Sequence, residues 1–171
     1  MTESINLIES SLRGRLLVSS DVVTTTSGTS QNIKNIPSWV KRITVSFNGV
    51  STNGTSNIIL QLGVNGTPET AGYVGAGRTF SAAGTTVYSS GFLLVNAIVA
   101  ARIASGQFVL VLLDGGTNTW SGSGIMAYSD VADVSLSAGK KSLAGILDMI
   151  RLTTVGGVDT FDAGNFSAIC E

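Results

Sequence analysis

Apolar and polar residues alternate along much of the chain, most clearly between Ile36 and Gly63. Two runs in this stretch place an apolar residue at every second position: Ile43, Val45 and Phe47, then Ile58, Leu60 and Leu62. Such a period indicates extended strands that bury one face. Between the runs, Asn48-Gly49 and Asn53-Gly54 tolerate the positive φ of tight turns. The pattern therefore predicts two strands that face one core, joined by one long turn or by two tight ones.

Similar short runs, separated by Gly, Ser, Thr and Asn, continue along the chain. We expect strands near residues 15–19, 22–26, 31–34, 40–47, 57–62, 87–94, 107–113, 119–128, 131–136, 145–153 and 165–169. This spacing, with a turn signal about every ten residues, is typical of an antiparallel all-β sandwich. The segment 96–104 could form one or two helical turns, because its Ala residues favour a helix, although its Ile and Val residues do not.

The first 14 residues depart from this pattern. Ile5, Ile8 and Leu12 follow the spacing i, i+3, i+7 of a short helix that Gly14 can end. Such a helix either packs on its own domain or docks the domain onto a neighbouring protein or the axis of a trimer. We take residues 1–14 as an N-terminal docking segment with Ile5, Ile8 and Leu12 as its contact residues, and residues 15–171 as one domain.

One predicted strand is apolar at every position: Phe108-Val109-Leu110-Val111-Leu112-Leu113. Both faces of such a strand should be covered, yet only one face of a strand meets the core of a two-sheet sandwich. Burying the other face against a neighbour would contribute about 1.5–3 kcal/mol for each side chain. Our candidates for a contact between subunits are Phe108, Val109, Leu110, Val111 and Leu112. The alternative is that a loop or the segment 96–104 covers this face.

Composition also favours an oligomer. Charged residues make up only 12% of the chain, against a usual ~25%, so a monomer would expose a large uncharged surface. The 10 basic and 11 acidic residues give a net charge of -1, without the basic footprint of a nucleic-acid or membrane-surface protein. Neither a signal peptide nor a run of about 18 apolar residues is present, so we expect no membrane insertion and synthesis in a cytoplasm.

Few residues offer catalytic or metal-binding chemistry. Histidine is absent, which excludes Ser-His-Asp and Cys-His nucleophiles and the common His-rich zinc sites. The single cysteine, Cys170, cannot form an intrachain disulfide. Four carboxylates could converge as a pair for glycoside cleavage, but nothing selects a pair among them: Glu69, Asp114, Asp130 and Asp133. We therefore predict no catalytic residue, no bound metal and no cofactor.

Two other segments resemble binding sites only superficially. Asp159 and Asp162 lack the spacing of an EF-hand calcium loop, and we interpret them as part of a turn. The glycine-rich segment 72–79 has no following helix and no Gly-Lys-Ser/Thr, so we expect an exposed loop there and not a phosphate site.

Several longer motifs occur in a fixed order. They are Ile36-Pro37-x-Trp39-x-Lys41-Arg42-Ile43-Thr44-Val45, Gly49-Val50-Ser51-Thr52-Asn53-Gly54-Thr55-Ser56, Gln61-Leu62-Gly63, Leu113-Asp114, Asn118-Thr119-Trp120-x-x-Ser123-Gly124, Leu147-Asp148-x-Ile150-Arg151-Leu152-Thr153-Thr154-Val155 and Asp159-Thr160-Phe161-Asp162-Ala163-Gly164. Together they resemble a domain found at the C-terminal tips of tailed-phage tail fibres and in related virion proteins. The resemblance covers residues 15–171 and departs at Ala168-Ile169-Cys170-Glu171, where a more aromatic strand is expected.

The resemblance implies a trimeric, jelly-roll-like β-sandwich on the virion surface, made in the host cytoplasm. Its implied partners are two further copies of the chain, other virion proteins and a host-surface glycan, which suits a non-enzymatic tail fibre tip. The alternative is a capsid decoration protein that stabilises the head, because the chain contains no shaft, coiled coil or repeat. A polysaccharide depolymerase is a third, weaker hypothesis.

An attachment protein needs side chains that bind sugars. Aromatic rings with a polar group can stack on sugar faces while nearby polar residues bond the hydroxyls. Our candidate glycan-binding residues are Tyr73, Tyr88, Arg78 and Trp120. For Trp39 we expect a packing role instead, since amphipathic aromatic residues are commonly part buried.

Overall fold

The computed structural model describes residues 17–81, 84–96, 99–100 and 102–171, and every regular element within them is a β-strand. The strands are β1 (Val18–Ser19), β2 (Val23–Thr24), β3 (Ser30–Lys34), β4 (Arg42–Thr52), β5 (Ile58–Val64), β6 (Thr67–Pro68), β7 (Val74–Thr79), β8 (Thr86–Val87), β9 (Phe92–Val95), β10 (Ala104–Asp114), β11 (Thr119–Tyr128), β12 (Val134–Ser142), β13 (Met149–Thr154) and β14 (Phe161–Cys170). The predicted all-β class is confirmed.

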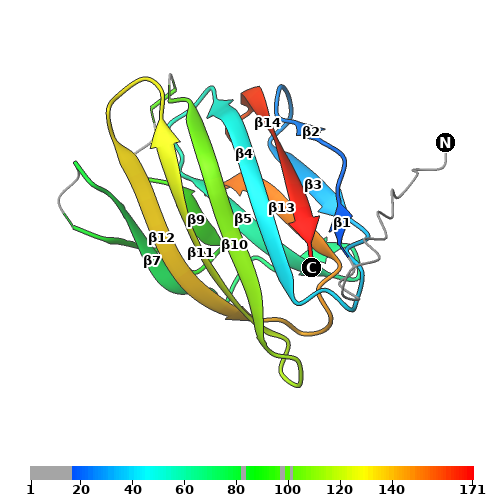
Figure 1. Ribbon diagram of the computed structural model, residues 1–171. Coiled ribbons are helices and arrows are strands. Elements are labelled where there is room, and N and C mark those ends of the chain that lie inside the picture. The colour runs from blue at the N-terminus through cyan, green and yellow to red at the C-terminus, as the bar shows by residue number, and fades with distance from the viewer. Residues whose placement is uncertain (1–16, 82–83, 97–98, 101) are drawn as a thin grey trace.

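The strands form two antiparallel sheets. The nine-stranded sheet, called the large sheet below, has the order β1-β14-β4-β10-β11-β12-β7-β8, and β2 also pairs with β14. The five-stranded small sheet has the order β3-β13-β5-β6, and β9 pairs with β5. Figure 1 shows β5, β13 and β3 behind the plane of β12, β11, β10, β4 and β14. This is a sandwich-like arrangement of two layers.

The two strands of the opening motif meet in the core, as predicted. Ile43, Val45 and Phe47 of β4 and Ile58, Leu60 and Leu62 of β5 are all buried in one hydrophobic cluster. The predicted turn at Asn48-Gly49 is wrong, because β4 continues to Thr52. The chain crosses from the large sheet to the small sheet only after Thr52. Gly49 has a φ of 65° inside the strand, next to shifts in the register of its neighbours. The glycine therefore accommodates an irregularity within β4.

The glycine-rich segment 72–79 is not an exposed loop, because Val74–Thr79 forms β7 of the large sheet. Its glycines allow close packing inside the sandwich. A Cβ atom on Gly77 would lie 2.7 Å from Leu93 Cδ2, and one on Gly75 would lie 2.6 Å from the carbonyl oxygen of Ala138. These glycines allow neighbouring strands and the two layers to approach closely. In the sequence, the same glycine-rich composition is also typical of a loop.

Two sequence predictions fall wholly or partly outside the described residues. The predicted N-terminal helix, with Ile5, Ile8 and Leu12, lies outside them altogether. In the segment 96–104, residues 97–98 and 101 lie outside them; Arg102 N donates to Val99 O in a turn, and β10 begins at Ala104.

Candidate assembly surface

Strand β10 divides its apolar residues between two environments. Phe108 and Leu110 are buried in the core at 1% and 0% exposure, and Leu112 packs against the same cluster. Val109 is half-buried on the opposite face, and Val111 remains 38% exposed. Only Val109 and Val111, of the five predicted contact residues, are therefore available to another subunit. The described residues leave this second face uncovered, in contrast to the alternative of a covering loop.

The strands on either side of β10 also alternate between buried inward residues and more exposed outward residues. In β4, Thr44 and Ser46 lie outward between buried residues, and in β11 Ser121, Ser123 and Ile125 do so. The inward positions of β11 include Gly122 and Gly124, where a Cβ atom would lie 2.4 Å and 2.6 Å from ring atoms of Phe108. These glycines make room for the Phe108 ring, so the core stays on one side of the sheet.

The outward residues line up in rows across the large sheet. One row is Ile169, Thr44, Val109, Ser123, Ala138, Ala76 and Val87. The next row is Ser167, Ser46, Gln107, Ile125, Leu136 and Arg78. A third is Arg42, Val111, Ser121, Lys140 and Val74. We call these rows the outer face.

The outer face is apolar or hydroxylated over most of its area. Its charged side chains are Arg42, Lys140 and Arg78, and Arg78 Nη2 donates to the carbonyl oxygen of Phe80. Ile125 is 59% exposed and Val74 62% exposed. A surface of this kind can be buried against another protein without removing many charges from water, which is the costly step in burying polar surface.

Tyr73, a predicted glycan-binding residue, is buried at 4% exposure. Its hydroxyl accepts a hydrogen bond from Leu62 N at 2.7 Å and donates to the carbonyl oxygen of Glu69 at 3.0 Å. Its ring packs edge-on against Phe92. Burial raises the pKa of this hydroxyl well above its usual value, against the hydrogen bond from Leu62. Tyr73 therefore ties β5 to the segment before β7 and offers no ring face to a sugar.

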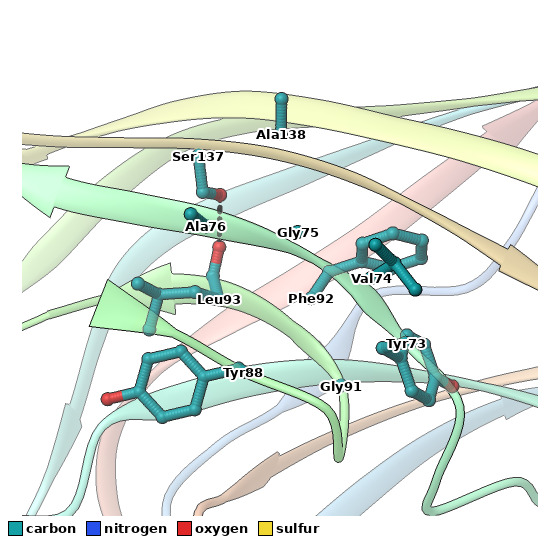
Figure 2. A pocket seen from close by; sticks show the side chains of 10 residues that line it. All are labelled: Tyr73, Val74, Gly75, Ala76, Tyr88, Gly91, Phe92, Leu93, Ser137 and Ala138. Carbon is teal, nitrogen blue, oxygen red and sulfur yellow. Dashed lines mark hydrogen bonds between the residues drawn. The ribbon is translucent and has the colours of Figure 1, made fainter. Parts of the chain in front are cut away.

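Tyr88 lines the same pocket as Tyr73, between β7 and β9 (Figure 2). The pocket has a volume of about 10 Å³, which is room for a single water molecule. The Tyr88 ring is half-buried, and its hydroxyl accepts a hydrogen bond from Asn57 Nδ2. Asn57 also donates to Asn96 Oδ1 at 3.3 Å. This pocket is too small for a sugar ring.

The structure does not bring the other two glycan candidates to these tyrosines. Trp120 is buried at 3% exposure on the inward side of β11, whereas Arg78 lies on the outer face. Trp39 is half-buried against the core, so its predicted packing role is confirmed. The four candidates do not form one sugar-binding surface, and only Arg78 and Tyr88 keep partial exposure.

The carboxylates considered for glycoside cleavage each have local partners. Glu69 pairs with Lys141 at 2.5 Å, and Asp130 pairs with Arg102 at 2.9 Å. Asp133 accepts hydrogen bonds from Ser81, and Asp114 from Gly116 and Thr117 in the turn after β10. These hydrogen bonds hold the pKa values of Asp133 and Asp114 below the usual range.

The segment around Asp159 also has a structural role. Asp159 Oδ2 accepts a hydrogen bond from Ser56 N at 2.7 Å, so this carboxylate holds the turn between β4 and β5. Among the described residues, no three His, Cys, Asp or Glu side chains group closely enough to hold a metal ion.

Sequence reasoning overlooked most of the exposed apolar residues. Phe80, at the end of β7, is 62% exposed, and Val87 is 73% exposed. Val74 and Val87 both belong to the outer face. The glycine-rich composition around Val74 concealed its strand, whereas Val87 was expected to begin a strand over residues 87–94 and lies instead in the short β8. Ile125 lay within a correctly predicted strand, and its position between inward Gly124 and Met126 is the signal that places it outside.

Comparison with known proteins adds no relative. No protein-family model matches the chain, and neither the curated proteins nor the solved structures contain a match to it. Within the part of the chain that the structure describes, no helix is long and apolar enough to cross a membrane. The outer face of the large sheet thus stands as the candidate functional surface on its own geometry.

Proposed function

We propose that this chain is a non-enzymatic structural protein of a bacteriophage virion, and that its copies associate through the outer face of the large sheet. The observation that supports the proposal is the row of Ile169, Thr44, Val109, Ser123, Ala138 and Ala76, which crosses the sheet without a charge. The motif resemblance to virion proteins supports the phage role and the number of copies, three.

The size of this face suits an interface between subunits. Strands about 4.8 Å apart and about 30 Å long give the outward side of the six strands from β14 to β7, which includes the outer face, an area of roughly 860 Å². A standard interface buries about 800 Å² on each partner. Burial of the whole outward side of these six strands would therefore match an ordinary, specific protein–protein contact in area.

The position on the virion has two candidate answers. A tail fibre tip that binds a host-surface glycan is the first, since the motifs resemble those of fibre tips. The burial of Tyr73 and Trp120 removes two of the aromatic residues that this role would use. That observation favours the second candidate, a capsid decoration protein, because a decoration protein needs contact surfaces and no sugar site.

Light scattering after size-exclusion chromatography tests the self-association. We expect the unmodified chain to have three times the monomer mass of 17.5 kDa. Ile125→Glu should give a monomer at the same concentration, because it buries a carboxylate in the contact. Val158→Glu is the matched control, since Val158 is 72% exposed in the loop between β13 and β14. A monomeric unmodified chain, or equal behaviour of the two variants, would refute the interface.

Immunogold electron microscopy of purified phage particles tests the virion role. Gold at the tail end would support the attachment protein, and gold over the head would support the decoration protein. Absence of the chain from particles would overturn the proposal of a virion protein, whatever its oligomeric state.

A further inference from the structure

The sandwich is open along one side, where the large sheet ends at β1 and the small sheet ends at β3. A groove of about 190 Å³ lies between these strands. Its apolar lining includes Val18, Ile33, Ile36 and Cys170, and its rim carries Asp21 and Lys34. We call this the edge groove. It is separate from the outer face.

Both walls of the edge groove are edge strands. β1 pairs with β14 through Val18 and Cys170, and β3 pairs with β13 along its whole length, each at the end of the strand order of its sheet. Unpaired strand edges invite pairing with other chains, and proteins commonly cover them. The groove therefore combines an apolar lining with two unpaired strand edges, and both features favour a segment of chain that covers them.

We propose that residues 5–12 of the same chain occupy the edge groove, with Ile5, Ile8 and Leu12 toward its lining. The described chain begins at Leu17, directly before Val18 in the wall of the groove. The four residues that remain between Leu12 and Leu17 can span about 13 Å when extended, which suffices to turn back over an adjoining groove. Gly14 permits the reversal.

The connection favours the chain's own segment over that of a neighbour. A short covalent connection holds a segment near its site at an effective concentration in the millimolar range. Free copies in solution rarely approach that concentration. The inference does not depend on the phage role.

The charges of the segment and the rim also match. Glu9 follows Ile8, and Arg13 follows Leu12 in the sequence. On the rim, Lys34 belongs to β3 and Asp21 lies between β1 and β2, and both are exposed. The segment can therefore place opposite charges near Lys34 and Asp21 while its apolar residues fill the hollow between them, as complementary interfaces do.

Maleimide labelling of Cys170 tests the occupancy in the full-length chain, because this is its single cysteine and it lines the groove. Replacing Ile8 and Leu12 together by Glu should speed labelling by roughly ten- to hundred-fold, because the loss of two apolar contacts releases the segment. Replacing Ser10 and Ser11 by Glu is the matched control and should leave the rate unchanged. Equal rates in all three proteins, with an unchanged far-ultraviolet spectrum, would overturn the proposal.

A cross-link then identifies which chain supplies the segment. In a Cys170→Ser background, Ile8→Cys and Lys34→Cys are combined and treated with a short bismaleimide. We expect a link within one chain, visible as a single peptide pair by mass spectrometry without a dimer band. A link between two chains, or none, would overturn the proposal. Ile8→Cys with Val158→Cys, which lies outside the groove lining, should give no link.

Discussion

Strands β5 and β10 both occupy inner positions in their sheets, but the chain covers both faces of β5 and only one face of β10. In β5, residues 58–63 are all buried. In β10, burial alternates, and Val111 is 38% exposed beside the buried Leu110. The difference cannot be attributed to hydrophobicity alone, since the exposed face of β10 carries valines.

The segment after β5 provides its second cover. Gln61 Nε2 donates to the carbonyl oxygen of Ser90 at 2.8 Å, and a Cβ atom on Gly91 would lie 2.9 Å from Ile59. The outer face around β10 has no such cover within the described residues. The chain thus buries both faces of β5 in its own core but leaves the outward face of β10 available for contact with other molecules.

The largest expected effect on the free energy of unfolding distinguishes the inward and outward residues of β10. In the Ile125→Glu background, which we expect to be monomeric, Phe108→Ala should lower the free energy of unfolding by about 3–5 kcal/mol, because the cavity left by the ring cannot be filled. Gly122 and Gly124 lie against that ring and have no side chain to move inward. Val109→Ala, one residue away, should cost less than about 1 kcal/mol. Equal losses in urea unfolding would mean that β10 is buried on both faces in the monomer.

A smaller effect tests the tight packing around Gly63 in β5, where the neighbouring strands approach closely. A Cβ atom on Gly63 would lie 2.4 Å from Met149 Cγ and 2.6 Å from the carbonyl oxygen of Thr67. Gly63→Ala should therefore lower the free energy of unfolding by about 1–3 kcal/mol through overpacking. Ser123→Val adds bulk to the outer face instead and should change it by less than about 0.5 kcal/mol. If both variants unfold at the same urea concentration, the packing around Gly63 is looser than the structure shows.

The smallest effect compares adjacent lysines of β12. Lys141 is buried at 7% exposure and pairs with Glu69, whereas Lys140 points outward. Burial raises the pKa of Glu69, but the hydrogen bonds from Lys141 and Ala144 and the charge of Lys141 outweigh burial and lower it below the ordinary 4.5. A lowered folded pKa stabilises the protein above the unfolded value, and this stability is lost as pH falls through the folded value.

The pH dependence follows from that sign. The free energy of unfolding should decline below about pH 4.5, and Glu69→Gln should flatten the decline by about 1 kcal/mol or less. Urea unfolding at several pH values in the monomeric background measures it. Lys140→Gln is the control and should leave the profile unchanged. An identical profile for Glu69→Gln would show that the pair contributes no pH-dependent stability.

Alternation in the sequence predicted the strands that bury one face. It placed β5, β10 and β11 close to their observed bounds but ended β4 at residue 47, whereas the strand continues to Thr52. It also marked residues 108–113 as needing cover on two sides. It could not predict which sheet each strand joins, because pairing between distant strands leaves no local pattern. β4 and β5 follow each other in sequence yet belong to different sheets.

The failures concern residues whose type suits two environments. β7 contains Gly75 and Gly77, which are as suitable for a loop as for close packing against β12 and β9. Tyr73 was expected at the surface because of its hydroxyl, but that hydroxyl finds its partners inside the protein. Trp120 could have been placed correctly, since the period of two in β11 aligns it with the buried Met126 and Tyr128.

The position of β14 has a consequence for the speed of folding. β14 lies between β1 and β4, and the hydrogen bond from Ala168 N to Ser20 Oγ joins residues 148 positions apart in the sequence. Closing so long a loop costs entropy before any contact repays it, and proteins dominated by distant contacts fold in milliseconds to seconds. Until β14 arrives, β4 presents a bare edge. Refolding of this chain should therefore become less efficient as its concentration rises, with aggregation competing against the last strand.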